Sequence, residues 1–258
     1  MPEATVAFPF FTVPIYSLAL ALGITLSVGI GLRRAALQPS TLIDTGLGAC
    51  LGGIIGARLV HVLLNWAYFA DNLSEALHPS AGGLDWHGAV IGGLIGLAVV
   101  AGWRKLNLRN LLDALAPALP LLAFAGWLGC WAAVCAYGAE VDTLAHTPGF
   151  AAAETRDVYG IVAPRYNTQV YGMLLALVLL LLSIVLIRRG WLKYRRFWLL
   201  LALLSAGMFV IGFFRGDYAI TVAELRADQV LDVGLFLWST ILTIYTGYSG
   251  KSLQVKAE

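Results

Sequence analysis

Residues 82–96 read GGLDWHGAVIGGLIG, and this stretch decides the class of fold. Behind its histidine the sequence is apolar, and glycines recur every four residues at positions 88, 92 and 96. The same spacing occurs at positions 48, 52 and 56. Residues at i, i+4 and i+8 share one face of a helix, and a stripe of glycines lets two helices approach closely within a membrane. The sequence therefore predicts that two membrane-spanning helices, 42–65 and 87–103, pack together.

The chain as a whole has the composition of an integral membrane protein. Of its 258 residues, 59% are hydrophobic and 12% are charged, whereas a soluble domain carries roughly a quarter charged residues. No basic region precedes the first apolar run, so we do not expect a cleaved signal peptide. We expect a single transmembrane domain over residues 1–258.

Seven apolar stretches reach or approach the length of about 20 residues that a spanning helix needs. The predicted fold is an all-α integral membrane protein with seven transmembrane helices. These helices are expected at residues 12–32, 42–65, 87–103, 111–137, 168–187, 197–214 and 229–248.

The basic residues predict the orientation of these spans. Most of the 17 Lys and Arg residues follow the first, third, fifth and seventh spans, at Arg33, Arg34, Arg104, Lys105, Arg109, Arg188, Arg189, Lys193, Arg195, Arg196, Lys251 and Lys256. Cytoplasmic loops carry an excess of Lys and Arg. We therefore expect the N-terminus outside and the C-terminus in the cytoplasm.

Polar side chains within the spans fall mainly in the half that this topology turns outward. Arg58 and His61 share one face of the second span, and Arg58 lies roughly 10 Å below the outer end of the span at Asn65. Polar groups inside a span are costly and are candidate functional residues, although Tyr, Trp and Arg are also common at membrane interfaces. The pattern favours a cavity reached from the outer side. The alternative is that these residues simply lie at the membrane interface. The other polar residues near the outer ends of spans are Tyr16, Asp85, His87, Gln169, Tyr171, Arg215, Gln229 and Asp232.

Cys130 and Cys135 stand five residues apart in the fourth predicted span. Such positions differ by about 140° around a helix, so a disulfide between them would require the helix to break. Two further metal ligands are not evident beside them. We therefore expect both cysteines to act as small apolar residues.

Three motifs resemble those of the prolipoprotein diacylglyceryl transferase family. They are GARLVHVLLNW at residues 56–66, GGLDWHGAVIG at 82–92 and PRYNTQVYG at 164–172. The family has a GGR stretch in its second span, an H-G-G motif at the start of its third and a Q-x-Y motif at the start of its fifth. The resemblance extends from about Tyr16 to Gln229.

This resemblance implies a bacterial inner (plasma) membrane enzyme whose active face is turned to the periplasm or exterior. The family moves the diacylglyceryl group of phosphatidylglycerol to the lipobox cysteine of a lipoprotein precursor, whose sulfur attacks the glycerol carbon while glycerol phosphate leaves. His87 and Tyr16 would be catalytic residues. Neither a metal nor another cofactor is expected, and no nucleic acid. The residues that would bind the phospholipid headgroup are Arg58, His61, Arg215, Gln169 and Tyr171.

Two stretches depart from the family pattern. Residues 126–138 read GWLGCWAAVCAYG, so Trp127 stands where the family has an arginine in G-R-L-G-N-F-x-N-G-E-x-W-G. Met208 replaces the first arginine of R-x-x-x-E-F-x-R in the sixth span. Losing a charged contact to a developing anion costs about 100- to 1000-fold in rate. The alternative is therefore a catalytically inactive, lipid-binding paralogue that serves as a structural subunit of a larger membrane complex.

A channel or transporter is a third, less favoured interpretation. Polar residues line only one side of the predicted membrane region, and we find no pair of broken helices at its middle.

Overall fold

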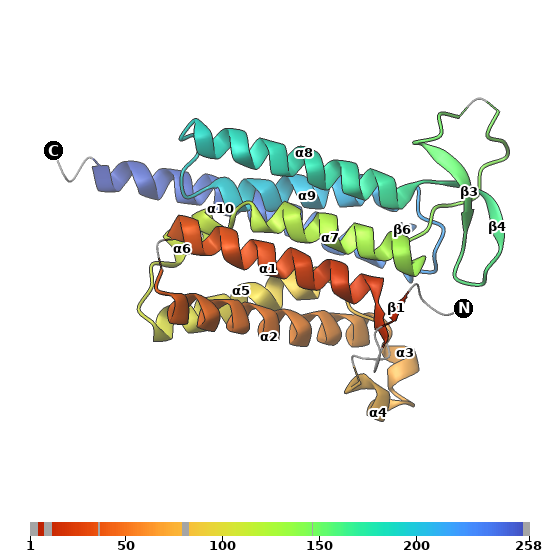
Figure 1. The fold of residues 1–258 in the computed structure, drawn as a ribbon, viewed down its shortest axis with the longest axis horizontal. Helices are drawn as coiled ribbons and strands as arrows, with labels where there is room; N and C mark the ends of the chain where they lie inside the picture. The colour runs from red at the N-terminus through yellow and green to blue at the C-terminus, as the bar shows by residue number, and fades with distance from the viewer. Residues whose placement is uncertain (1–4, 8–11, 36, 79–82, 146, 255–258) are drawn as a thin grey trace.

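The computed structural model describes residues 5–7, 12–35, 37–78, 83–145 and 147–254, and it describes the backbone alone for Leu32 and residues 248–254. Long helices run side by side in an elongated bundle (Figure 1). They are α1 (Ile15–Ala35), α2 (Pro39–Leu64), α5 (Trp86–Trp103), α7 (Ala118–Ala133), α8 (Thr168–Arg188), α9 (Arg196–Gly212) and α10 (Ala227–Gln254). Shorter helices between them are α3 (Trp66–Phe69), α4 (Leu73–Ala76) and α6 (Leu108–Leu115).

Short antiparallel hairpins, which the sequence did not predict, lie at one end of the bundle with α3 and α4 (Figure 1). They pair β1 (Thr5–Ala7) with β2 (Thr12–Pro14), β3 (Ala152–Arg156) with β4 (Val162–Tyr166), and β5 (Thr221–Val222) with β6 (Leu225–Arg226). We call this the hairpin end. The opposite end, where α1, α5 and α8 finish, is the basic end and carries Arg33, Arg34, Arg104, Lys105, Arg188 and Arg189.

A mostly helical membrane protein is confirmed as the class of fold, and a helix occupies each of the predicted stretches. Within the described residues, five helices are long and apolar enough to cross a bilayer: α1, α2, α5, α8 and α10. Helix α9 is shorter, at 17 residues. The fourth predicted stretch is divided into α6 and α7, which meet at an angle of 46°. Pro117 stands between them and cannot donate the hydrogen bond that would continue one helix into the other.

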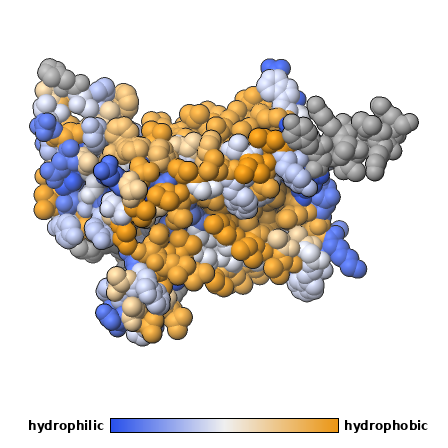
Figure 2. All heavy atoms as spheres, turned by 180° about the vertical axis from the view of Figure 1, so that it is seen from behind, coloured by the Kyte–Doolittle hydropathy of each residue, from blue (hydrophilic) through white to orange (hydrophobic). Residues whose placement is uncertain are grey.

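The face of the bundle shown in Figure 2 is apolar over its middle and more polar at its two ends. Exposed apolar side chains of this extent are typical of a surface that faces lipid rather than water. Along α2 they include Ile43, Leu47, Leu51, Ile55, Leu59 and Leu63.

Helices α2 and α5 approach each other through their glycines. A Cβ atom built on Gly52 would lie 2.2 Å from the carbonyl oxygen of Gly92, and one built on Gly92 would lie 2.1 Å from that of Gly52. Gly56, Gly88 and Gly96 meet the backbone of the facing helix at similarly short distances. The predicted pairing of the two glycine-bearing spans is therefore confirmed.

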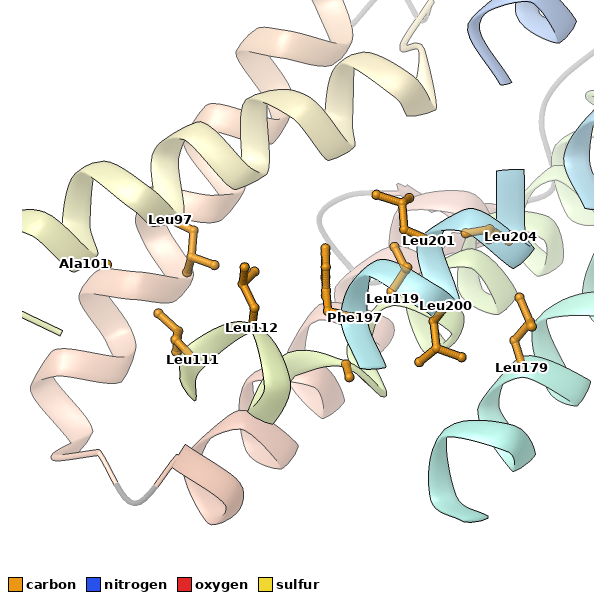
Figure 3. Close-up of a cluster of buried hydrophobic side chains, with 11 residues drawn as sticks. Leu97, Ala101, Leu111, Leu112, Leu119, Leu179, Phe197, Leu200, Leu201 and Leu204 are labelled. Atoms are coloured by element: carbon orange, nitrogen blue, oxygen red, sulfur yellow. The ribbon is translucent and has the colours of Figure 1, made fainter. Parts of the chain in front are cut away.

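A buried apolar cluster lies toward the basic end of the bundle (Figure 3). It joins helices α5 to α9 through Leu97, Ala101, Leu111, Leu112, Ala116, Leu119, Leu179, Phe197, Leu200, Leu201 and Leu204. Beside it, the buried Asp113 accepts hydrogen bonds from Nη1 of Arg196 and from the backbone N–H of Tyr194, each at 2.8 Å. These contacts hold together the helices whose other ends form the hairpin end.

Candidate functional site

A pocket of about 340 Å³ opens at the hairpin end, between the end of α2 and the segment that carries α3 and α4. Arg58 and His61, which the sequence predicts on one face of a span, both line it. The pocket combines cationic and polar groups with aromatic rings, a composition suited to a polar group attached to an apolar molecule. The remaining lining residues are Asn65, Tyr68, Phe69, Glu75 and Gly83.

The guanidinium of Arg58 ties the pocket wall to α2. It donates hydrogen bonds to the backbone carbonyls of Ala76 at 3.0 Å, Gly83 at 3.1 Å and Glu75 at 2.6 Å. Its central carbon lies 5.1 Å from the centre of the Phe69 ring, within the range of a cation–π contact. Arg58 therefore shapes the pocket as well as placing a positive charge in it.

His61 lies one turn nearer the end of α2 than Arg58, with its ring edge-on to Phe69 and its Nδ1 atom 3.5 Å from the Nδ2 atom of Asn65. Gly83 packs directly on this ring, since a Cβ atom there would lie 2.2 Å from the Nε2 atom of His61. Gly83 also has a φ of +77°, a conformation that favours glycine. Both its backbone conformation and its packing against His61 therefore require a glycine at position 83.

An acidic and a phenolic side chain meet at the mouth of the pocket. The hydroxyl of Tyr68 donates a hydrogen bond to Oε2 of Glu75 at 2.7 Å. This hydrogen bond and the negative charge of Glu75 raise the pKa of the Tyr68 hydroxyl.

His87 lies outside this pocket and is almost completely buried, with 1% of its surface exposed. Asp85 caps the helix that His87 opens, because its carboxylate accepts hydrogen bonds from the backbone N–H groups of His87 and Gly88 at 2.9 and 3.1 Å. Burial alone would raise the pKa of Asp85, but hydrogen bonds from the His87 side chain and from these N–H groups outweigh it and lower the pKa.

Arg215 lies in a separate cluster of charges, in the connection between α9 and α10. Its Nε and Nη1 atoms donate to Asp217 at 2.8 Å and to Asp228 at 2.7 Å. Arg226 bonds both of these aspartates as well. Burial would lower the pKa of Arg215, but its hydrogen bond to Asp217 and the nearby carboxylates outweigh this and raise it. The cluster therefore holds the α9–α10 connection together.

The other predicted residues hold α7, α8 and the β3–β4 hairpin in place. Tyr16 packs against α7, where a Cβ atom on Gly129 would lie 2.6 Å from its ring. Gln169 donates its Nε2–H to the carbonyl of Cys135 at 2.9 Å, and the hydroxyl of Tyr171 donates to the carbonyl of Ala151. Of the predicted residues, only Arg58 and His61 line the pocket within the part of the chain that the structure describes.

The prediction that Cys130 and Cys135 remain separate is wrong, because they form a disulfide with their Cα atoms 4.7 Å apart. The prediction assumed a helix that continues to residue 137. Helix α7 instead ends at Ala133, and Val134 adopts a left-handed conformation with a φ of 58°. The N–H of Cys135 then bonds back to the carbonyl of Cys130 at 3.0 Å. The helix break that a disulfide requires is therefore present.

Trp127 fills space between helices at the position where the family pattern has an arginine. Its indole is buried and lies against α8, where a Cβ atom on Gly172 would lie 2.0 Å from a ring atom. Met208, at the second such position, is partly buried against the apolar cluster. Both substitutions thus exchange a charge for apolar packing.

One cluster at the hairpin end was missed by reasoning from the sequence. The buried Arg165 pairs through Nη2 with Glu140 at 2.7 Å and with Asp157 at 3.1 Å, and its guanidinium lies over the Tyr137 ring. Arg165 stands within the PRYNTQVYG motif, which could have drawn attention to it. Its partners Glu140 and Asp157 lie in loops, and no sequence pattern indicates that these loops come close to Arg165.

Chemical labelling tests the disulfide directly. Denatured protein is expected to take up one maleimide, at Cys50, without reductant and three after reduction. Replacing both Cys130 and Cys135 with serine should lower the free energy of unfolding by about 2 kcal/mol, because a short loop is no longer closed in the unfolded chain. Cys50→Ser serves as the control and should leave stability unchanged. Three labels on unreduced protein would contradict the pairing.

An apolar helix bundle with a polar, cationic pocket at one end is the architecture of a multi-pass membrane protein. A family model described as prolipoprotein diacylglyceryl transferase matches residues 3–245. The chain therefore belongs to the prolipoprotein diacylglyceryl transferase family, and the resemblance seen in its motifs is confirmed.

Curated relatives are similar over most of this chain. A phosphatidylglycerol–prolipoprotein diacylglyceryl transferase of Clostridium novyi (strain NT) is 30% identical over 254 residues, which cover 96% of this chain and 97% of the relative. A protein of the same name from Staphylococcus aureus (strain Newman) is 29% identical over 237 residues, covering 89% of this chain and 84% of the relative.

Proposed function

We propose that this chain transfers a diacylglyceryl group from phosphatidylglycerol to the cysteine of a prolipoprotein. The observation that carries this proposal is the family match over residues 3–245, together with relatives of that name that align over 84% or more of their length. A single transmembrane domain in a bacterial inner membrane fits this function, since both the lipid and the prolipoprotein are reached at the membrane surface.

The reaction requires a nucleophile and a stabilised leaving group. The thiolate of the acceptor attacks a glycerol carbon of the lipid, a carbon–sulfur bond forms, and the bond from that carbon to the phosphate oxygen breaks. Glycerol phosphate leaves with the electron pair of this bond, and the thiol proton passes to a base. Cationic donors near the phosphate lower the barrier because negative charge develops on the leaving oxygen. Arg58 is the proposed cationic donor in the pocket, and His61 beside it is a second hydrogen-bond donor to the headgroup.

The remaining predicted residues keep their proposed roles at the hairpin end. Arg215, Gln169 and Tyr171 would support the headgroup site, and Tyr16 and His87 the chemistry. Each of the last four makes contacts that position α7, α8 or α5. Their effect on catalysis is therefore expected to act largely through the arrangement of helices.

We propose seven spans with the hairpin end and the N-terminus outside and the basic end in the cytoplasm. The clustering of basic residues at one end supports this orientation. The Cys130–Cys135 disulfide at the hairpin end is independent support, because disulfides form and persist in oxidising compartments outside the cytoplasm.

The second candidate function is an inactive, lipid-binding paralogue that serves as a subunit of a larger membrane complex. Trp127 and Met208 favour it, since both occupy arginine positions of the family and both contribute apolar packing. The ion pairs of Arg215 with Asp217 and Asp228 favour it as well, because a phosphate would have to compete with two carboxylates.

Reconstitution into vesicles distinguishes the two functions. The purified chain in phosphatidylglycerol vesicles is expected to add a diacylglyceryl thioether to a lipobox peptide, which mass spectrometry detects, and to release glycerol phosphate. A peptide with serine in place of the cysteine should stay unmodified. If the Staphylococcus aureus relative modifies the peptide under the same conditions and this chain does not, the transferase proposal fails. Co-purification with defined partners from native membranes would then support the subunit.

A further inference from the structure

His87, in the first turn of α5, is held by two carboxylates. Its Nδ1 atom lies 3.1 Å from Oδ1 of Asp85, and its Nε2 atom lies 3.0 Å from Oδ1 of Asp232. Asp232 stands on α10, 145 residues further along the chain, and only 3% of its surface is exposed. Both nitrogens of the His87 ring are therefore engaged with acidic side chains from different parts of the fold.

These two contacts favour a ring that carries a proton on each nitrogen. A neutral imidazole has one N–H group and one lone pair, whereas an ionised carboxylate can only accept hydrogen bonds. Two ionised carboxylates therefore require N–H groups on both ring nitrogens. Each carboxylate also stabilises the charged ring, because a nearby negative charge and a hydrogen bond to the charged form both favour protonation of a histidine. Asp85 also accepts hydrogen bonds from two backbone N–H groups, which favour its ionised form.

We infer that Asp232 is a positioning residue for His87: with Asp85 it holds the ring by both nitrogens as a doubly protonated imidazolium that joins α5 to α10. The link matters because α10 packs mainly on α9 and touches α5 over a short stretch only. A buried ion pair at this point fixes how the two helices are placed relative to each other.

The bridge also reaches the pocket through the glycine contacts. Gly88 follows His87 and packs on the backbone of α2 at Gly56, two residues before Arg58. Fixing His87 against Asp232 therefore fixes the part of α2 that places Arg58. As far as turnover is concerned, this inference rests on the proposed function. While the bridge holds, His87 has no lone pair for the thiol proton, and it contributes through position.

Nitrogen NMR of protein labelled with ¹⁵N-histidine tests the protonation without any need for turnover. The chain has four histidines, and His87→Gln identifies the signals of His87 by their loss. Both of its ring nitrogens are expected to show protonated shifts at pH 7. In Asp232→Asn the new amide can donate to Nε2, so the ring should keep the proton facing Asp85 and lose the other. Nε2 should then move to the shift of an unprotonated nitrogen.

Ser239→Ala is the matched control, because Ser239 is also buried on α10 and its hydroxyl bonds the carbonyl of Leu235 in the same helix at 2.6 Å. It should leave the His87 signals unchanged. An unprotonated nitrogen in the unaltered protein would overturn the inference, and so would an Asp232→Asn spectrum identical to it. The first outcome needs only His87→Gln, for assignment, and does not depend on how Asp232→Asn folds.

Turnover separates this inference from the proposed function. If the chain is active, Asp232→Asn should lower kcat by about 100-fold with little change in KM, as expected for misplaced reacting groups. A chain without activity whose spectra change as described would sink the transferase proposal and leave the bridge in place. An active chain whose His87 is singly protonated would overturn the bridge and leave the transferase proposal in place.

Discussion

Replacing Gly92 with alanine is expected to lower the free energy of unfolding by about 3 kcal/mol, at the upper end of the range for overpacking a well-filled interior. The new methyl group would lie 2.1 Å from the carbonyl oxygen of Gly52 and 2.9 Å from the Cα atom of Gly56. Both contacts are with backbone, so no side chain can rotate away and α2 must move off α5. A fall of roughly 10 °C in the melting temperature of the protein in detergent would report this loss.

Gly102→Ala is the matched control on the same helix. A Cβ atom at this position has nothing within 4 Å, and alanine favours a helix over glycine by about 1 kcal/mol. This variant should therefore melt at the same temperature as the unaltered protein or slightly higher. Equal losses of stability in the two variants would show that the glycine face does not mediate the packing of α2 on α5.

The second large effect is expected at Arg58, whose replacement by alanine should lower transferase activity by about 100- to 1000-fold. The variant removes a positive charge from the proposed headgroup pocket and the donors that hold the carbonyls of Glu75, Ala76 and Gly83. Arg58→Lys keeps the charge but cannot reproduce the planar set of donors. It should therefore be intermediate in activity. Peptide modification in vesicles of fixed phosphatidylglycerol content measures both variants.

Arg58 has two proposed roles, holding the pocket wall and binding the headgroup, and proteolysis together with a variant of a distant arginine separates them. Without its hydrogen bonds the segment that carries α3 and α4 should become sensitive to protease, which does not depend on turnover. Arg104→Ala removes an arginine at the basic end, where it pairs with Asp44, and should leave activity unchanged. Full activity of Arg58→Ala would place the headgroup site elsewhere.

The glycine pattern predicted a packing face because its cause is local. Spacing of four residues sets which atoms share a side of a helix, and small residues there permit close approach whatever surrounds them. The facing stripe around Gly52 and Gly92 is accordingly found as predicted. The length of the fourth predicted helix, 111–137, was overestimated, because Pro117 and the left-handed Val134 limit α7 at its two ends.

The candidate site depends on contacts that no local pattern contains. One wall of the pocket comes from a connecting segment, which Arg58 holds through the backbone carbonyls of Glu75 and Gly83. Asp232 meets His87 across 145 residues of sequence. The sequence could identify Arg58 by its depth in a span and His87 by its place in a family motif, but their partners follow from how the helices pack.

The disulfide at the end of α7 has a chemical consequence for a protein proposed to alkylate thiols. A cysteine is a nucleophile only as its thiolate, and a sulfur bonded to another sulfur has no thiolate form. Pairing Cys130 with Cys135 thus removes both of the chain's own candidate acceptors from the end where the precursor's cysteine would be modified. Cys50, which remains free, lies within α2 between the two ends. On the proposed function and orientation, the disulfide keeps these two cysteines from being alkylated by the protein itself.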